Sequence, residues 1–299
     1  MTETKTPPAA GAVQGGMAEG MAIHRAHESM RPEGERICYD PYAYRFIDPA
    51  LLRFAAEHPE ESAAKYAEME QFFPGLGNSI RARVRFFDEF TEKICSEWIT
   101  QLVLFGAGYD TRACRLSGLQ ENVRVFEVDR ADTQAFKKEK VLEIFGNLPA
   151  HVVYVPVDCE KENPGVALVR HGFSRGEKTL FVLEGFIMYL PPEAVDEILL
   201  FIRDNAGEGS RIIFDYYPQS VIDRTGVDNV ARNILDYTIT AGEPLKSGIP
   251  DGEIVRFLAA RGFKKIHRVT SGQYRQLYFT GKNAKRPVCD LLSFAYAEA

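Results

Sequence analysis

The stretch Gln101-Leu-Val-Leu-Phe-Gly-Ala-Gly-Tyr-Asp-Thr-Arg-Ala-Cys-Arg-Leu116 decides the fold. Its apolar run, Leu102 to Phe105, has the length of a buried parallel strand. Gly106-Ala107-Gly108 then breaks the run, and Tyr109 to Leu116 can start a helix. Glycine lets the backbone approach a ligand closely, and a helix N-terminus offers free N–H groups. The stretch therefore predicts a nucleotide-binding corner between a strand and a helix.

A second apolar strand, Val123 to Asp129, ends in carboxylates one helix and one strand after the glycines. An acid at this distance suits the ribose hydroxyls of a bound nucleoside. We expect Asp129 to take that role and Glu127 to support it from behind. A dinucleotide fingerprint needs a third glycine where this chain has Thr111. The corner therefore favours a cofactor with an adenosine but no phosphates, of which S-adenosylmethionine (SAM) is the common one.

Several further motifs occur in a fixed order between about residue 22 and residue 190. Together they resemble the leucine carboxyl methyltransferase-like family of SAM-dependent O-methyltransferases, in its bacterial small-molecule branch. Two of them, Gly-Ala-Gly-x-Asp-Thr-Arg and Glu-Gly-x-x-Met-Tyr-Leu, are much more specific than a lone glycine turn. The matching segments are His24-Arg-Ala-His-Glu-Ser29, Asp40-Pro-Tyr-Ala43, Arg83-Val-Arg-Phe-Phe-Asp88, Phe105-Gly-Ala-Gly-Tyr-Asp-Thr-Arg112, Phe126-Glu-Val-Asp129, Val155-Pro-Val-Asp158 and Glu184-Gly-Phe-Ile-Met-Tyr-Leu190.

The resemblance implies a set of residues that bind SAM. Arg83 would meet the free carboxylate of SAM with two bonds, which the planar guanidinium allows, and Arg25 is a weaker candidate for the same role. Asp158 would contact the adenine ring, although it can also cap the following helix. Glu184 would hold the methionine part. The full expected set is Arg83, Gly106, Ala107, Gly108, Asp129, Asp158, Cys159 and Glu184.

The remaining candidates have two readings each. Asp110, Thr111 and Arg112 can contact the cofactor, or they can cap the helix and form a structural ion pair. Met188 and Tyr189, which follow Glu184, can line the acceptor site or belong to the core. These two residues and Tyr216 are the candidates for positioning the acceptor, and no catalytic residue is assigned. His24 and His27 have no third ligand partner, so the sequence indicates no metal site.

Composition limits the class of protein. The chain has 299 residues, 45% apolar and 26% charged, which is ordinary for a globular protein. Its net charge of −6 argues against a nucleic-acid partner. No apolar run approaches a membrane span, and no signal peptide is visible, so no membrane partner is expected. Five widely spaced cysteines favour a reduced, cytoplasmic protein. The oligomeric state cannot be deduced.

The chain before the first strand predicts a disordered start, residues 1–16, and then a helical cap, residues 17–98. The expected helices of the cap are Gly20–Arg31, Tyr42–Phe54, Ser62–Phe72 and Ser79–Trp98. Residues 99–299 would form the SAM-binding methyltransferase domain.

Strands and helices alternate after the first two strands. We expect further strands at Val152–Pro156, Thr179–Leu183 and Arg211–Asp215, with helices at Gln134–Gly146, Asn163–His171 and Glu193–Asp204. Phe263–Arg268 and Tyr274–Thr280 predict a hairpin across Thr270-Ser-Gly272. The fold class is thus α/β, a Rossmann-like, mostly parallel sheet with a C-terminal antiparallel hairpin. Residues 216–250, too long for a plain connection, predict an inserted lid over the acceptor pocket.

Methyl transfer to an oxygen, on a small-molecule carboxylate or hydroxyl, is the function these motifs favour. A carboxylate is already ionised at pH 7 and needs no general base, whereas a phenol benefits from one. The strand-end motifs contain no evident histidine base, which mildly favours a carboxylate. Three alternatives stay open: a protein C-terminal carboxyl methyltransferase, a non-catalytic SAM-binding protein and an NAD-dependent oxidoreductase.

Overall fold

The computed structural model describes residues 16–97, 99–119 and 123–299. The predicted disorder of residues 1–16 therefore lies, apart from Gly16, outside the described residues. Seven strands form one sheet in the order β3-β2-β1-β4-β5-β7-β6. Their bounds are β1 Gln101–Phe105, β2 Arg124–Asp129, β3 Val152–Pro156, β4 Thr179–Leu183, β5 Arg211–Tyr216, β6 Lys264–Val269 and β7 Ser293–Glu298.

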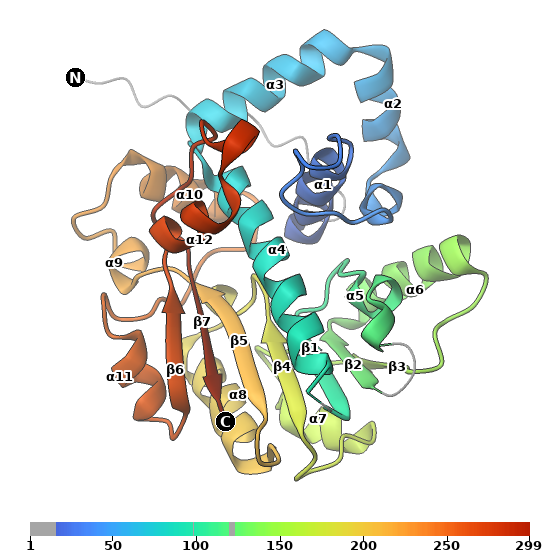
Figure 1. Ribbon diagram of the computed structural model, residues 1–299, viewed down its shortest axis with the longest axis vertical. Helices are drawn as coiled ribbons and strands as arrows, with labels where there is room; N and C mark the ends of the chain where they lie inside the picture. The colour runs from blue at the N-terminus through green and yellow to red at the C-terminus, as the bar shows by residue number, and fades with distance from the viewer. Residues whose placement is uncertain (1–15, 98, 120–122) are drawn as a thin grey trace.

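Strands β1 to β5 pair in parallel, and β7 runs antiparallel to both of its neighbours, β5 and β6. The predicted α/β class with a mostly parallel sheet and antiparallel C-terminal strands is confirmed. The carboxyl ends of β1, β2, β4 and β5 consequently lie at one edge of the sheet. In Figure 1, α1 lies above this edge and α4 crosses in front of the sheet.

The predicted hairpin is wrong in its second strand. Tyr274–Thr280 does not pair with β6; residues Ser271–Tyr278 form helix α12, and the antiparallel partner of β6 is β7. Thr270 and Gln273 form a capping box that starts this helix, each side chain bonding the backbone of the other residue. Tyr274 is fully buried and stacks on Phe294 of β7. The capping box and the burial of Tyr274 thus favour a helix here, although the alternating pattern predicts a strand.

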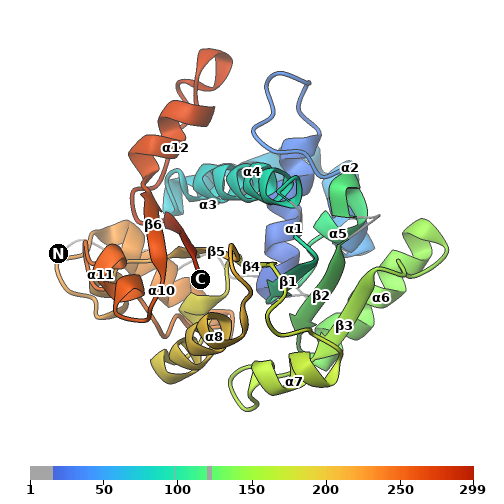
Figure 2. The same cartoon turned by 60° about the horizontal axis from the view of Figure 1, so that its bottom comes forward.

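Helices cover both faces of the sheet (Figure 2). Helix α4 and the later α10 and α12 pack on one face, while α7, α8 and α11 pack on the other. The helix bounds are α1 Gly16–Ser29, α2 Pro49–Glu57, α3 Pro59–Phe72, α4 Leu76–Cys95, α5 Arg112–Arg115, α6 Ala131–Phe145, α7 Pro164–Arg170, α8 Pro192–Asn205, α9 Gln219–Ile222, α10 Asn229–Thr240, α11 Ile254–Ala259 and α12 Ser271–Tyr278, with 3-10 turns η1 Ala43–Phe46, η2 Ser117–Leu119, η3 Ile187–Tyr189 and η4 Gly281–Asn283.

The expected helices before β1 form, with one correction. The expected helix Tyr42–Phe54 is instead two elements, η1 and α2, separated at Ile47 and Asp48. Pro49 disfavours a helical conformation at Asp48, whose ψ of 123° is extended, and the Asp48 carboxylate caps α2 instead. The expected helix Ser79–Trp98 is α4, which ends at Cys95, while Trp98 lies outside the described residues.

Residues 216–250, the expected lid, contain the helices α9 and α10. Ala231, Ile234 and Leu235 of α10 are buried in the same core as α4 and β1. The Asn233 side chain also donates a hydrogen bond to the Phe72 carbonyl, at 2.9 Å. This segment is therefore packed into the body of the molecule. None of the described helices has the length and apolarity needed to cross a membrane.

Candidate functional site

The turn after β1 requires glycine for two reasons. Gly106 and Gly108 have φ angles of +61° and +42°, in the left-handed region that other residues avoid. A Cβ on Gly106 would also overlap the ring of Phe186, which follows β4. At Gly108 a Cβ would lie 3.5 Å from the Ala18 Cβ of helix α1. Glycine at this position keeps the space between the turn and α1 open.

Asp129 is held in a fixed orientation at the end of β2. The Gly108 N–H donates to its Oδ2 at 2.6 Å, and the Arg130 N–H donates to its Oδ1 at 2.7 Å. Burial raises the pKa of Asp129, and these two N–H groups oppose the rise. Glu127 lies behind it, where it forms a buried ion pair with Lys137 at 2.7 Å. The glycine turn and the strand-end acid therefore form one structural unit.

Glu184, at the end of β4, lies between two arginines. The Arg83 Nε is 3.0 Å from its Oε1, and the Arg112 Nη1 is 2.6 Å from its Oε2. Arg83 also donates through Nη1 to Asp215 of β5, at 2.7 Å. Although burial raises the pKa of Glu184, the charges of Arg112 and Arg83 outweigh it and hold that pKa below its usual value. Glu184 is thus an ionised, oriented carboxylate.

Asp215 is a site residue that the sequence reading missed. It is completely buried, and its second oxygen accepts a hydrogen bond from the Gly185 N–H, at 2.5 Å. It therefore orients both Arg83 and the turn after β4. The signal was present, because Asp215 ends the apolar strand expected over Arg211–Asp215, as Asp129 ends the strand expected before it. In the structure β5 extends one residue further, to Tyr216.

The Arg83 guanidinium already forms ion pairs with Glu184 and Asp215, so it is not an unpaired cation available for the SAM carboxylate. Its remaining nitrogen, Nη2, lies 3.3 Å from the Met21 sulfur of α1. Burial alone would lower the pKa of Arg83, but the negative charges of Asp215 and Glu184 have a larger, opposite effect. The pKa is therefore above its usual value, and the guanidinium stays charged. Nη2 is accordingly the atom that Arg83 can still offer to a ligand.

The other candidates near the glycine turn have structural partners. Arg25 pairs with Asp40 at 2.9 Å and donates to the Tyr109 carbonyl at 2.6 Å. The Asp110 carboxylate accepts from the Arg112 N–H and pairs with its guanidinium, both at 2.7 Å. This is the capping and ion-pair arrangement that was one of the two readings. Thr111 precedes α5, which is shorter than the helix expected over Tyr109–Leu116.

A cavity of about 560 Å³ joins these groups. Its size is within the range of small-molecule sites. Asp158 lines it and does not cap α7, whose cap is Asn163. Burial raises the pKa of the neighbouring Cys159 thiol to about 12. The sequence-derived candidates that line the cavity are Arg25, Arg83, Gly106, Ala107, Gly108, Asp110, Arg112, Asp129, Asp158, Cys159, Glu184, Met188 and Tyr189.

Tyr216 does not line this cavity, so its candidacy for positioning the acceptor is wrong. It packs in the core on the opposite face of the sheet, close to Phe214. Successive side chains of a strand point to opposite faces. Tyr217 therefore takes the position on the cavity side, where it lines the wall.

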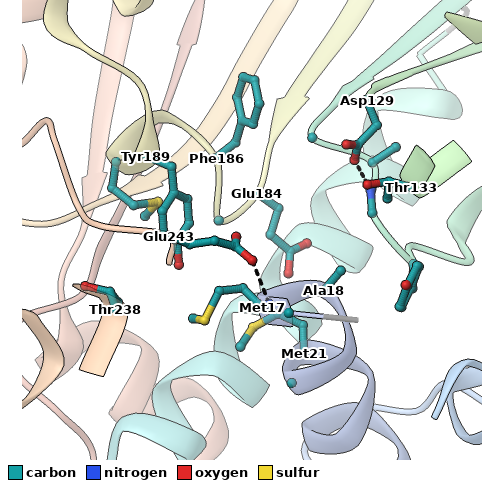
Figure 3. A pocket seen from close by; sticks show the side chains of 18 of the residues that line it. Met17, Ala18, Met21, Asp129, Thr133, Glu184, Phe186, Tyr189, Thr238 and Glu243 are labelled. Carbon is teal, nitrogen blue, oxygen red and sulfur yellow. Dashed lines mark hydrogen bonds between the residues drawn. The ribbon is translucent and has the colours of Figure 1, made fainter. Parts of the chain in front are cut away.

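The cavity has two parts that Figure 3 separates. Asp129 and Thr133 lie at one end, and Glu184 lies between the ends. At the other end, side chains of α1, η3 and the segment around α10 gather. The sequence reading missed most of this second group, of which only His24 lies in one of the motifs quoted above. Its members include Met17, Met21, His24, Tyr217, Tyr237, Thr238 and Glu243.

Comparison with known proteins gives the family of this chain. The profile described as leucine carboxyl methyltransferase matches residues 18–203. The chain belongs to this family. The match includes the glycine turn, Asp129, Asp158 and Glu184, and it ends before the segment around α10.

Relatives of this leucine carboxyl methyltransferase family member are bacterial proteins. One from Mycobacterium avium is 33% identical over 85% of this chain and 84% of its own length, and YktD of Bacillus subtilis is 28% identical over 66% and 64%. Both are named as S-adenosyl-L-methionine-dependent methyltransferases. The chain spans about two thirds of the length of several such relatives, including one from Saccharopolyspora erythraea that is 33% identical over 66% of each chain.

Solved structures agree on the fold. A Streptomyces avermitilis protein of the duf574 family superposes with a TM-score of 0.59, 14% identity and coverage of 93% of this chain and 96% of its own. A protein from Thermobifida fusca described as a methyltransferase gives a TM-score of 0.57 and 18% identity, with coverage of 81% and 88%. At these identities the likeness concerns the fold alone.

Proposed function

We propose that this chain is a SAM-dependent O-methyltransferase that acts on a small molecule. The observation that carries the proposal is the continuity of one cavity from the glycine turn and Asp129, past Glu184, to the chamber beside α10. Such a cavity has room for a cofactor and a second substrate end to end. S-adenosylmethionine is the cofactor, as the names of the relatives support.

The polar groups of the cavity fit SAM. Asp129 is a fixed carboxylate, suited to a ribose diol. Glu184 can meet an ammonium group, and the Nη2 of Arg83 can meet a carboxylate. The oxygen of the hydroxyl or carboxyl acceptor would then lie in the chamber beside Tyr189 and Met188. Gly108 leaves the passage next to Ala18 open for the cofactor.

Bound SAM supplies an activated methyl group and leaves as a neutral thioether. This chain has to hold the acceptor in line with the methyl group and keep water away. Met188 is buried and Tyr189 lies beside it in η3, and both line the cavity directly after Glu184. They are the residues that we propose as the acceptor wall nearest the transferred group.

The test uses SAM labelled with ¹³C in its methyl group. The protein is incubated with labelled SAM and a small-molecule extract, and the products are read by carbon NMR. Oxygen-bound ¹³C-methyl products that require the protein support the proposal. Label on nitrogen or carbon, or label only in added protein substrates, contradicts it. Binding of SAM without any transfer to extract or protein would indicate the non-catalytic alternative.

A further inference from the structure

We infer that the acceptor enters the cavity as an uncharged hydroxyl on a predominantly apolar molecule, and that Glu243 excludes carboxylates. This inference rests on the proposed function and adds to it the class of the acceptor. It comes from the charges and the apolar surface of the chamber between α1, α4 and α10.

The wall of the chamber is mostly apolar and aromatic. Helix α4 and the residues before it contribute Phe73, Leu76 and Ile80, and α10 contributes Ile234 and Tyr237. Figure 3 shows Met17 and Met21 facing the same space as Tyr189. Thioether and aromatic side chains suit an apolar surface of variable shape. A strongly hydrated acceptor would lose its water here with little in return.

No described arginine or lysine that lines the cavity offers an unpaired positive charge to an acceptor carboxylate. Each one has at least one acidic partner in the described part of the chain. Arg83 has two, and its free Nη2 is the group proposed for the carboxylate of SAM. The pairs are Arg25–Asp40, Arg83–Glu184, Arg83–Asp215, Arg112–Asp88, Arg112–Asp110, Arg112–Glu184, Arg115–Asp88, Arg130–Asp132 and Lys246–Glu160.

Histidine does not replace the missing cation. His24 lines the cavity, and its Nδ1 is buried without a hydrogen-bond partner. Burial, followed by the charge of Arg81, lowers the pKa of His24 to about 3. The imidazole is therefore neutral at physiological pH. His24 therefore adds no positive charge to offset an acceptor carboxylate, and an ionised group buried without a partner is strongly disfavoured.

Glu243 adds an anion to the same chamber. One of its oxygens accepts a hydrogen bond from the Met17 N–H of α1, at 3.0 Å, and no ion pair to it is found within residues 16–97, 99–119 and 123–299. Figure 3 shows this bond and the Tyr189 ring beside it. Burial, and then the charge of Glu243, raises the pKa of Tyr189, so this phenol stays neutral and can hydrogen-bond a hydroxyl. An acceptor carboxylate would instead be repelled by Glu243.

The sequence alone mildly favoured a carboxylate, because the strand-end motifs supply no base. The structure reverses this preference through two features outside those motifs. One is the pairing of every described cation in the cavity, and the other is the position of Glu243 after α10. Both depend on contacts between segments that are distant in the sequence.

The experiment compares two flat molecules of the same ring system. The full-length protein is loaded with S-adenosylhomocysteine, and 2-naphthol and 2-naphthoate are titrated into it by calorimetry at pH 7. At this pH the first is a neutral phenol and the second a carboxylate. We expect 2-naphthol to bind at least tenfold more tightly. Glu243→Gln should narrow this ratio at least threefold by improving naphthoate binding, since its amide oxygen can still accept from Met17.

Glu208→Gln is the matched control, because Glu208 is exposed and does not line the cavity. It should leave the ratio unchanged. Equal or tighter binding of 2-naphthoate overturns the inference, as does failure of both probes to bind. If the ratio of the 2-naphthol and 2-naphthoate affinities is unchanged in Glu243→Gln, Glu243 does not exclude carboxylates. In all these cases, binding of S-adenosylhomocysteine remains consistent with the proposed function. Failure to bind S-adenosylhomocysteine overturns the proposed function itself.

Discussion

Arg83 and Glu184 are 101 positions apart in the sequence and 3.0 Å apart in the structure. Arg83 comes from the middle of α4, and Glu184 follows β4. The side chains of both are largely buried, with 6% and 13% exposed. Their contact joins the helix that crosses the sheet to the edge where parallel strands deliver their acids. The cofactor end of the cavity is therefore built by α4 and the sheet together.

Replacing Arg83 tests this contact. Arg83→Lys keeps a charge but loses the planar fork, so one of the bonds to Glu184, Asp215 and SAM must be lost. A charge-assisted bond is worth about 1.5–3 kcal/mol, and we expect SAM affinity to fall roughly ten- to a hundredfold. Calorimetry measures it. Arg85→Lys, an exposed neighbour on α4 paired with Glu89, is the control and should bind normally. Unchanged affinity in Arg83→Lys would exclude the proposed role.

Asp129 offers a second test of the cofactor end. Asp129→Asn removes the charge and turns one oxygen into a donor, which conflicts with the N–H groups of Gly108 and Arg130. We expect SAM affinity to fall by about tenfold or more. Asp132→Asn, three positions along in the exposed first turn of α6, should bind as wild type does. Equal affinities for the two variants would show that Asp129 does not hold the ribose.

Gly106→Ala should destabilise the protein through both strain and overlap. A left-handed φ costs an alanine about 1–2 kcal/mol, and overpacking against Phe186 adds roughly 1–3 kcal/mol. Gly146→Ala separates the two effects. Gly146 has a φ of +77° but nothing within 4 Å of its missing Cβ. Urea unfolding should therefore show a clearly larger loss for Gly106→Ala, and similar losses would mean that Phe186 moves freely aside.

Asp110 should give the protein a pH-dependent part of its stability. Burial raises its pKa, but Arg112 outweighs this and lowers the pKa from 3.8 to about 2. A lowered folded-state pKa contributes stability above the unfolded value and loses it as pH falls through the folded one. Asp110→Asn should cost about 2 kcal/mol at pH 6. The difference from wild type in urea unfolding should shrink between pH 4 and pH 2, and a difference that grows there would contradict the assignment.

Much of the sheet was predictable because local pattern and burial agree. Strands β3 and β4 have the bounds expected from their apolar runs. Asp129 ends β2, Glu184 follows β4, and Asp215 lies one residue before the end of β5, all at the edge where ligands bind. The strand expected at Tyr274–Thr280 is instead helix α12, and this difference has a physical reason. There the short-range capping box of Thr270 and Gln273 competes with an alternating pattern, and the cap prevails.

The acceptor end was less predictable than the cofactor end. Tyr216 and Tyr217 are adjacent, and only the register of β5 decides which of them faces the cavity. Glu243 reaches the site through a bond to Met17, 226 positions away in the sequence. Neither relation leaves a periodic or compositional signal. The chamber therefore required the structure, whereas the glycine turn did not.

The most direct test of the account is a calorimetric titration of the wild-type protein with SAM, and separately with NADH. We expect that SAM binds at one site per chain and that NADH gives no binding heat, because the glycine turn and Asp129 suit an adenosine without phosphates. Binding of NADH without binding of SAM would contradict the account.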